Sequence, residues 1–169
     1  MLEEANDARN VRFRKDRNVL NIAGTGVMLF GIWSVIKTYT TFFEAPAKMF
    51  EGIDELSEMD MTEIILLSCT LAMVLSFDLL IRLYVGLKSR AESKGKKAGS
   101  LYLLVTIFLS IASLGFFILE VFSFVGQPEL STIAEMIVEL TSLIIQIELL
   151  ISAIRIKTFK PVEVKMHAA

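Results

Sequence analysis

Ionisable side chains interrupt the apolar stretches of this 169-residue chain, where they could carry protons or cations or pair with one another. Asp78 and Arg82 lie four residues apart within "MVLSFDLLIRLYV", residues 73–85. In a helix this spacing places both side chains on one face and allows an ion pair. Charged groups inside a membrane span mark ion or proton paths, or else hold neighbouring helices together. Which of these two roles the charged residues have depends on the helices that position them.

Four long apolar runs dominate the chain, at about 19–43, 64–87, 101–125 and 131–156. About 20 apolar residues in a helix cross a hydrocarbon core of about 30 Å. A soluble bundle would instead show polar faces with a period of 3.6, which "IILLSCTLAMVLSF" lacks. The hydrophobic fraction of 54% and the mean hydropathy of +0.60 agree with this interpretation. The sequence therefore predicts an all-α integral membrane four-helix bundle.

Basic residues are concentrated in the segments 1–18, 88–100 and 157–169, together with the adjacent Arg155. These segments alternate with an acidic loop at 44–63 and a short loop at 126–130, which share only Lys48. Because short cytoplasmic loops are rich in Lys and Arg, we predict that both termini and the 88–100 loop are cytoplasmic. The plasma (inner) membrane is the expected location. Its lipid bilayer is the expected partner of the basic segments.

An outer polar layer is expected from the depths of three charged residues. Lys37 lies six residues before Phe43, about 9 Å below the outer surface at helical rise. Glu120 and Glu139 have similar depths in the third and fourth runs. We therefore expect Lys37 to pair with Glu120 or Glu139 across helices.

An inner polar layer is expected nearer the cytoplasm. Its members would be Asp78, Arg82, Gln146, Glu148 and Arg155. Arg82 could also extend its head group to the inner surface. We expect the acids and bases of this layer to form a network.

The predicted span 131–156 has polar residues on two nearly opposite faces. The two sets are Glu139, Ser142 and Gln146, and Thr141, Glu148, Ser152 and Arg155. Two residues turn a helix by about 200°, so one bundle cannot cover both faces. The second face indicates a homo-oligomer or another membrane protein as partner, unless water hydrates Glu148 from the cytoplasm.

Small and polar residues recur at helical spacing and indicate contact faces. The candidates are Gly24 and Gly31, then Ser68, Ala72 and Ser76, and then Thr106, Ser110 and Ser113 leading to Glu120. Small residues permit close approach of membrane helices, and hydroxyl groups can bond across them.

A possible duplicated helical hairpin is indicated by "FDLLIRLYVGLK" and "IELLISAIRIKTFK". Each begins with an acid, followed by Leu-Leu-Ile and basic residues. Lys37 and Glu120 also each follow a glycine, Gly31 or Gly115. Such hairpins would be parallel repeats about an axis along the membrane normal.

The sequence lacks the residues that metal binding, hydrolysis and nucleic-acid binding would need. Cys69 is the only cysteine and His167, in the tail, the only histidine, so the sequence favours neither a metal site nor a hydrolase. The basic segments lack interleaved aromatics, which argues against nucleic-acid binding. We expect no enzymatic activity and no cofactor.

Two functions remain. The first is a membrane protein that acts through self-assembly or as a subunit of a complex, with polar layers that fix helix packing. The second is a small oligomeric channel or a proton- or cation-coupled transporter that uses Asp78, Glu139, Gln146 and Glu148. Closed ion pairs would favour the first, and an unpaired acid beside a water-filled path would favour the second.

Overall fold

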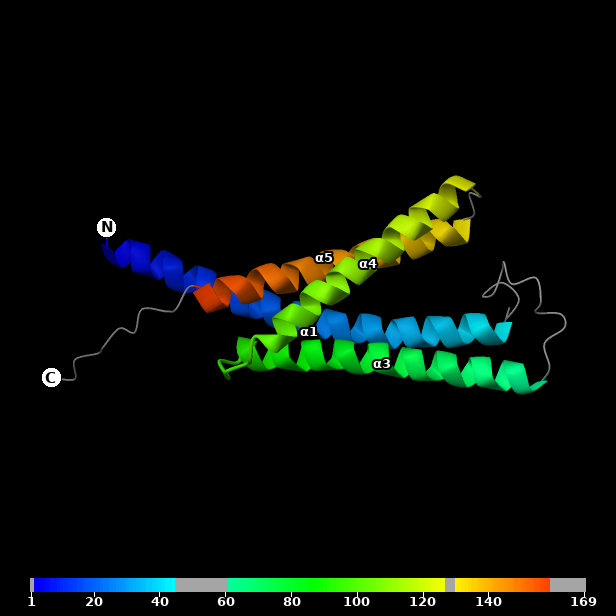
Figure 1. Cartoon of the computed structure of the whole chain (residues 1–169). Helices are drawn as coiled ribbons and strands as arrows, with labels where there is room; N and C mark the ends of the chain where they lie inside the picture. Colours follow the sequence, from blue (N-terminus) through cyan, green and yellow to red (C-terminus); the bar gives the residue numbers. More distant parts are fainter. Residues whose placement is uncertain (1, 45–60, 127–129, 159–169) are drawn as a thin grey trace.

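The computed structural model describes residues 2–44, 61–126 and 130–158. Four helices make up nearly all of this part, and it contains no strand (Figure 1). They are α1 (Leu2–Glu44), α3 (Met61–Ser93), α4 (Leu101–Gly126) and α5 (Leu130–Thr158). Most of the predicted acidic loop and of the tail lies outside the described residues, which leave out 45–60 and 159–169. Residues 127–129 of the second loop are also outside the described part.

Each helix contains a stretch long and apolar enough to cross a membrane. The stretches are Arg9–Phe42, Ile65–Ser93, Leu101–Phe122 and Ile133–Thr158. This confirms the prediction of an all-helical chain with four potential membrane spans. The apolar window of the second stretch contains no buried residue.

Helix α3 continues to Ser93, six residues past the end of the apolar run predicted at 64–87. It ends in a Schellman motif, in which the Gly95 N–H donates to the Glu92 carbonyl at 2.9 Å and the Lys96 N–H to the Ala91 carbonyl at 3.0 Å. Gly95 has a φ of 82°, a conformation that glycine adopts without the strain a side chain would cause. This glycine therefore fixes where α3 ends and where the connection to α4 begins.

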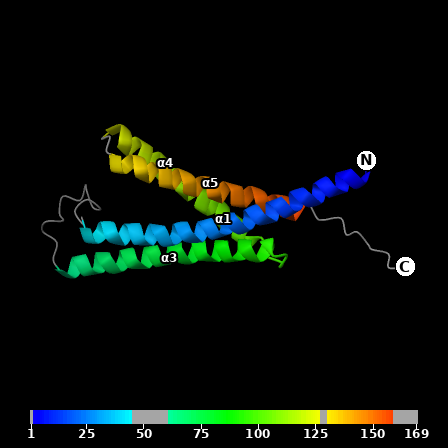
Figure 2. The ribbon, with the colours of Figure 1, turned by 180° about the vertical axis from the view of Figure 1, so that it is seen from behind.

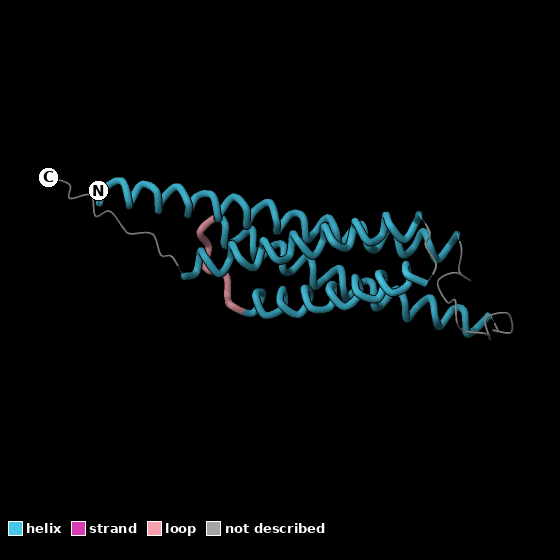
Figure 3. The backbone as a smooth tube through the Cα atoms, turned by 90° about the horizontal axis from the view of Figure 1, so that it is seen from above, coloured by secondary structure: helices cyan, strands magenta, loops and turns pink. Residues whose placement is uncertain are grey.

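The helices form two antiparallel pairs. Helix α1 packs along α3 and along α5, and α4 packs along α5. The pairs lie close together near the α3–α4 connection and diverge toward their other ends (Figures 1 and 2). Figure 3 shows the beginning of α1 at the same end as the α3–α4 connection, drawn in pink. We call residues 9–27, 81–109 and 145–158 the basic half, and residues 28–44, 61–80, 110–126 and 130–144 the distal half.

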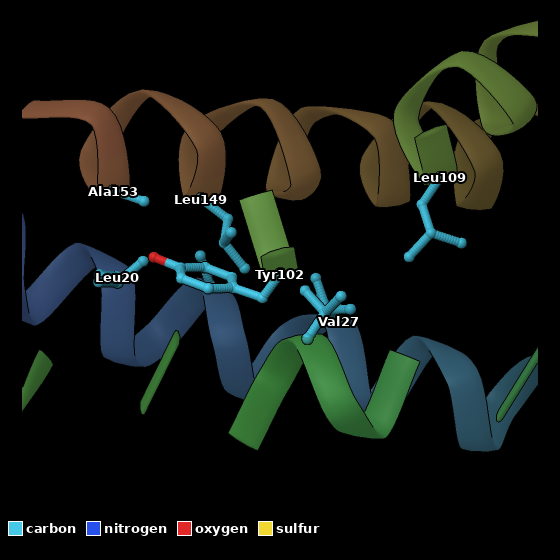
Figure 4. Packing of buried hydrophobic residues seen from close by; sticks show 8 residues of the cluster. Leu20, Val27, Tyr102, Leu109, Leu149 and Ala153 are labelled. Carbon is cyan, nitrogen blue, oxygen red and sulfur yellow. The ribbon is translucent and has the colours of Figure 1, made fainter. Parts of the chain in front are cut away.

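The hydrophobic core lies in the basic half. Its buried members are Leu20, Ala23, Val27, Val85, Tyr102, Leu109, Leu149 and Ala153. The ring of Tyr102 lies between α1 and α5, next to Leu20 and Leu149 (Figure 4). In the described distal half, Leu143 is the only large apolar side chain that is buried. Packing therefore joins the two helix pairs mainly in the basic half.

Helices α1 and α3 approach closely at Gly24 and Gly86. A Cβ atom at Gly86 would lie 2.5 Å from the Gly24 carbonyl oxygen and 2.3 Å from Cγ of Met28. The sequence pattern identified Gly24 on α1 and, separately, the small residues Ser68, Ala72 and Ser76 on α3, but it missed Gly86. Of these three, Ser76 is exposed and donates to the Ala72 carbonyl of its own helix.

Candidate functional site

Asp78 and Arg82 form an ion pair within α3. Arg82 Nε lies 2.9 Å from Asp78 Oδ2, and the Arg82 side chain is only 13% exposed. The pair lies where α3 meets α1, because a Cβ atom at Gly31 would be 3.0 Å from Cδ of Arg82. Gly31 thus leaves room for the arginine stem. The local spacing supplies Asp78 with a cation on its own helix.

Lys37 bridges α1 and α5, but its partner differs from the expected one. Lys37 Nζ lies 3.1 Å from Oε1 of Glu135, one turn before Glu139. The prediction that Lys37 pairs with Glu120 or Glu139 is therefore corrected. Helix α1 packs against α5 rather than α4, and the position of α5 along its axis brings Glu135, one turn before Glu139, to the amine.

Glu120 and Glu139 nevertheless lie near this pair. The carboxylate of Glu120 interacts electrostatically with Glu139, Lys37 and Glu135. One Glu120 oxygen, Oε2, is buried and has no hydrogen-bond partner in the described part of the chain. We call Lys37, Glu120, Glu135 and Glu139 the distal carboxylate cluster. The cluster contains three acids and one base, one acid more than the outer layer of Lys37, Glu120 and Glu139 expected from the sequence.

Gln146 joins α5 to α4 in a polar contact inside the protein. Its Nε2 donates to Ser113 Oγ at 3.1 Å and to Ser142 Oγ at 3.3 Å, and the residue is 1% exposed. Its Oε1 is buried without a partner among the described residues. Gln146 therefore bonds to the polar stripe of α4 and not to Asp78 or Arg82. The expected inner network divides into separate contacts.

Arg155 and Glu148 also lie apart from the Asp78–Arg82 pair. Arg155 Nη1 is 3.7 Å from Oδ1 of Asp16 on α1, whereas Glu148 is exposed. Within the described residues, Glu148 has neither an ion pair nor a hydrogen bond. Gln146 and Leu149 occupy the inward side of this turn, so Glu148 is turned outward. The expected outer face is thus present, but Ser152 is buried and does not belong to it.

One polar contact was missed from the sequence. The Tyr102 hydroxyl donates to Oε2 of Glu92, joining the last turn of α3 to the first turn of α4. Lys157 Nζ lies 5.0 Å from the centre of the Tyr102 ring and donates to the Gly99 carbonyl at 3.4 Å. The available signal was the continuation of helix-forming residues past Lys88, which places Glu92 on a helix rather than in a loop.

These contacts define a chain with polar groups distributed along four potential membrane spans. The described residues contain no group of three or more His, Cys, Asp or Glu side chains suited to a metal ion. Comparison of the chain with protein-family models, curated proteins and solved structures finds no match. The class of the protein therefore rests on its four apolar helices and their polar contacts.

Proposed function

We propose that the protein is a non-enzymatic membrane subunit that acts by assembling with copies of itself or with another membrane protein. Its polar contacts fix how the helices pack. In this proposal the four helices form a bundle in the plasma membrane, with the basic half toward the cytoplasm, as the distribution of Lys and Arg favours. The observation that carries the proposal is the outward position of Glu148.

Glu148 lies within the potential span Ile133–Thr158. It precedes Arg155, at the basic end of α5, by seven residues, or about 10 Å at helical rise. A charged group at that depth costs about 2.5–3.5 kcal/mol when it has no partner. A hydrogen-bond donor on a neighbouring membrane helix would offset much of this cost. Glu148 therefore favours a protein neighbour over lipid.

The residues around Glu148 form a face suited to such a neighbour. Exposed side chains alternate at spacings of four and three, at Ile137, Thr141, Ile144, Glu148, Ile151 and Arg155. This is the spacing of a seam between two packed helices. Ile144 is 50% exposed and Ile151 44% exposed, so the chain leaves this part of the seam uncovered, whereas Arg155 at its end pairs with Asp16 of α1. We call these six residues the α5 outer face.

Native mass spectrometry of the protein released from lipid nanodiscs tests this proposal. We expect the wild type to appear as an oligomer or with a co-purified membrane protein, and Glu148→Leu to reduce that species at least tenfold. Thr70→Val is the control, because Thr70 is an exposed polar residue of α3 whose hydroxyl already donates to the Leu66 carbonyl. Single copies in the wild type, or equal losses in both variants, would refute the role of Glu148.

A second function, proton or cation transport, is supported by the distal carboxylate cluster. Three carboxylates around a single lysine leave an excess of acid that a proton or cation would neutralise. Flux into proteoliposomes, compared between the wild type and Glu120→Gln, tests this function. Flux that Glu120→Gln abolishes without loss of thermal stability would establish transport. Absence of wild-type flux would leave the cluster a packing contact.

A further inference from the structure

A basic pocket lies between α1 and α3 in the basic half. It has a volume of about 350 Å³ and is lined by Arg14, Arg17, Asn18, Asn21, Ser93 and Lys94. The lining thus contains three cations and two amides, and no carboxylate from the described residues. The pocket opens to the surface near the start of the predicted span 19–43. It therefore lies at the depth where lipid phosphates would be found.

The pocket holds one of its cations in a fixed position. Arg17 donates from Nε to the Ser93 carbonyl at the end of α3, and its guanidinium lies 5.9 Å from the centre of the Phe13 ring. Because Nε is used, the terminal Nη groups are those left to face an occupant. Gly95, which ends α3, lies beside this guanidinium, because a Cβ atom at Gly95 would lie 3.5 Å from Nη2 of Arg17.

Two other features of the pocket would suit a ligand in which a hydrogen-bond donor lies next to a phosphate. Arg14, Arg17 and Asn21 follow one another at helical spacings of three and four, so their side chains lie along one side of α1. Oδ1 of Asn21 is buried and has no hydrogen-bond partner in the described part of the chain. A donor next to the phosphate, such as a headgroup hydroxyl, would satisfy this oxygen.

We propose that this pocket binds the phosphate of an anionic phospholipid headgroup through Arg14, Arg17 and Lys94. The occupant is a lipid rather than a soluble phosphate, because the two helices that line the pocket carry the potential membrane spans Arg9–Phe42 and Ile65–Ser93, which acyl chains would cover. Arg17 supplies a paired N–H fork, and Lys94 and Arg14 supply charge from the two helices. The bound lipid would link α1 to α3 at the membrane surface.

The test measures lipid binding to the full-length protein in neutral detergent by native mass spectrometry. Dioleoyl phosphatidylglycerol is compared with dioleoyl phosphatidylcholine, which has the same acyl chains and no net charge. The pocket variant is Arg14→Gln with Lys94→Gln, which leaves the Arg17 contact to Ser93 intact. The matched control is Arg12→Gln with Lys97→Gln, which removes the same charge from exposed positions outside the pocket.

We expect the wild type to prefer phosphatidylglycerol, and the pocket variant to bind it roughly thirtyfold more weakly, at about one factor of five for each cation removed. The control should keep most of the preference. If phosphatidylglycerol binding weakened equally in the two variants, the proposal of a specific pocket would be wrong, since only general surface charge would then be involved. Millimolar inorganic phosphate should not displace the lipid, and displacement by phosphate alone would overturn the lipid assignment.

Discussion

The basic and distal halves of the molecule differ in how their helices are held. In the basic half, buried side chains from all four helices pack together, and the Glu92–Tyr102 contact closes the α3–α4 connection. In the distal half, the Lys37–Glu135 bridge joins α1 to α5, while most large apolar side chains are exposed. The two helix pairs diverge there (Figure 1). The same four helices thus combine a packed region with an open one.

This difference has a physical basis if the four apolar helices cross a membrane, which their length and composition allow. Lipid tails are as apolar as leucine, so helices associate there through close packing and hydrogen bonds rather than through removal of apolar surface from water. Close packing occurs at Gly24 and Gly86, in the basic half of the contact between α1 and α3. The distal half contains the distal carboxylate cluster and, among its described large apolar side chains, only Leu143 is buried. We therefore expect substitutions in the basic half to affect folding, and those in the distal half to affect assembly.

The largest effect is expected for Gly86→Ala. The new Cβ atom would lie 2.5 Å from the Gly24 carbonyl oxygen, a backbone atom, so α1 and α3 must separate. We expect a loss of about 3 kcal/mol in the free energy of unfolding, measured by steric trapping in micelles. Gly115→Ala is the control, because nothing lies within 4 Å of its Cβ position. Equal losses of unfolding free energy in Gly86→Ala and Gly115→Ala would contradict the close approach of α1 and α3 at Gly86.

A smaller effect is expected for Leu149→Ala in the core. Leu149 is fully buried, and its removal leaves a cavity between α1, α4 and α5. We expect a loss of about 2 kcal/mol, at the low end of such substitutions because lipid rather than water is the alternative environment. Leu119→Ala in the distal half, where the leucine is 63% exposed, should change the same unfolding free energy by less than about 0.5 kcal/mol. A similar loss at both leucines would abolish the distinction between the halves.

Tyr102→Phe should lower the free energy of unfolding by about 1.5 kcal/mol, because Glu92 loses its hydroxyl donor while it remains buried. The ring and its packing are kept, so the change isolates the hydrogen bond. Tyr84→Phe provides the comparison and should cost less, because the Tyr84 hydroxyl makes no hydrogen bond among the described residues and the ring contact with Lys88 is kept. Unfolding free energies in micelles measure both. An unchanged value for Tyr102→Phe would show that the Glu92 contact does not stabilise the α3–α4 connection.

The smallest effect is expected for the Lys37–Glu135 bridge. Both side chains are partly exposed, at 35% and 43%, and contacts between membrane helices average about 0.6 kcal/mol. A double-mutant cycle with Lys37→Met and Glu135→Gln should therefore give a coupling energy of about 0.5–1 kcal/mol. The same cycle with Glu139→Gln in place of Glu135→Gln should give less. A larger coupling to Glu139 would restore the pairing expected from the sequence.

Local patterns predicted part of this structure well. Hydropathy alone located the four apolar helices, because a membrane span needs a continuous run of about 20 residues. The Asp78–Arg82 pair followed from a spacing of four on one helix. Both inferences depend only on residues near one another in the chain.

Contacts between helices were harder to predict. Whether Lys37 meets Glu135 or Glu139 depends on a shift of one turn, about 5.4 Å, and span boundaries read from sequence are no more precise than that. The rotation of α5 likewise separated Glu148 from Arg82 and directed Gln146 to Ser113. The contact between Gly24 and Gly86 required the crossing point of two helices, which no single sequence pattern specifies.

The most direct test of the assembly proposal is photo-crosslinking in native membranes from a diazirine amino acid at position 144. Ile144 lies on the α5 outer face, one turn from Glu148, and Leu104 on α4 is a similarly exposed control. We predict protein adducts from position 144, either to a second copy or to another membrane protein, and mainly lipid adducts from position 104. Lipid adducts alone from position 144 would show that lipid covers the α5 outer face, and would contradict assembly through it.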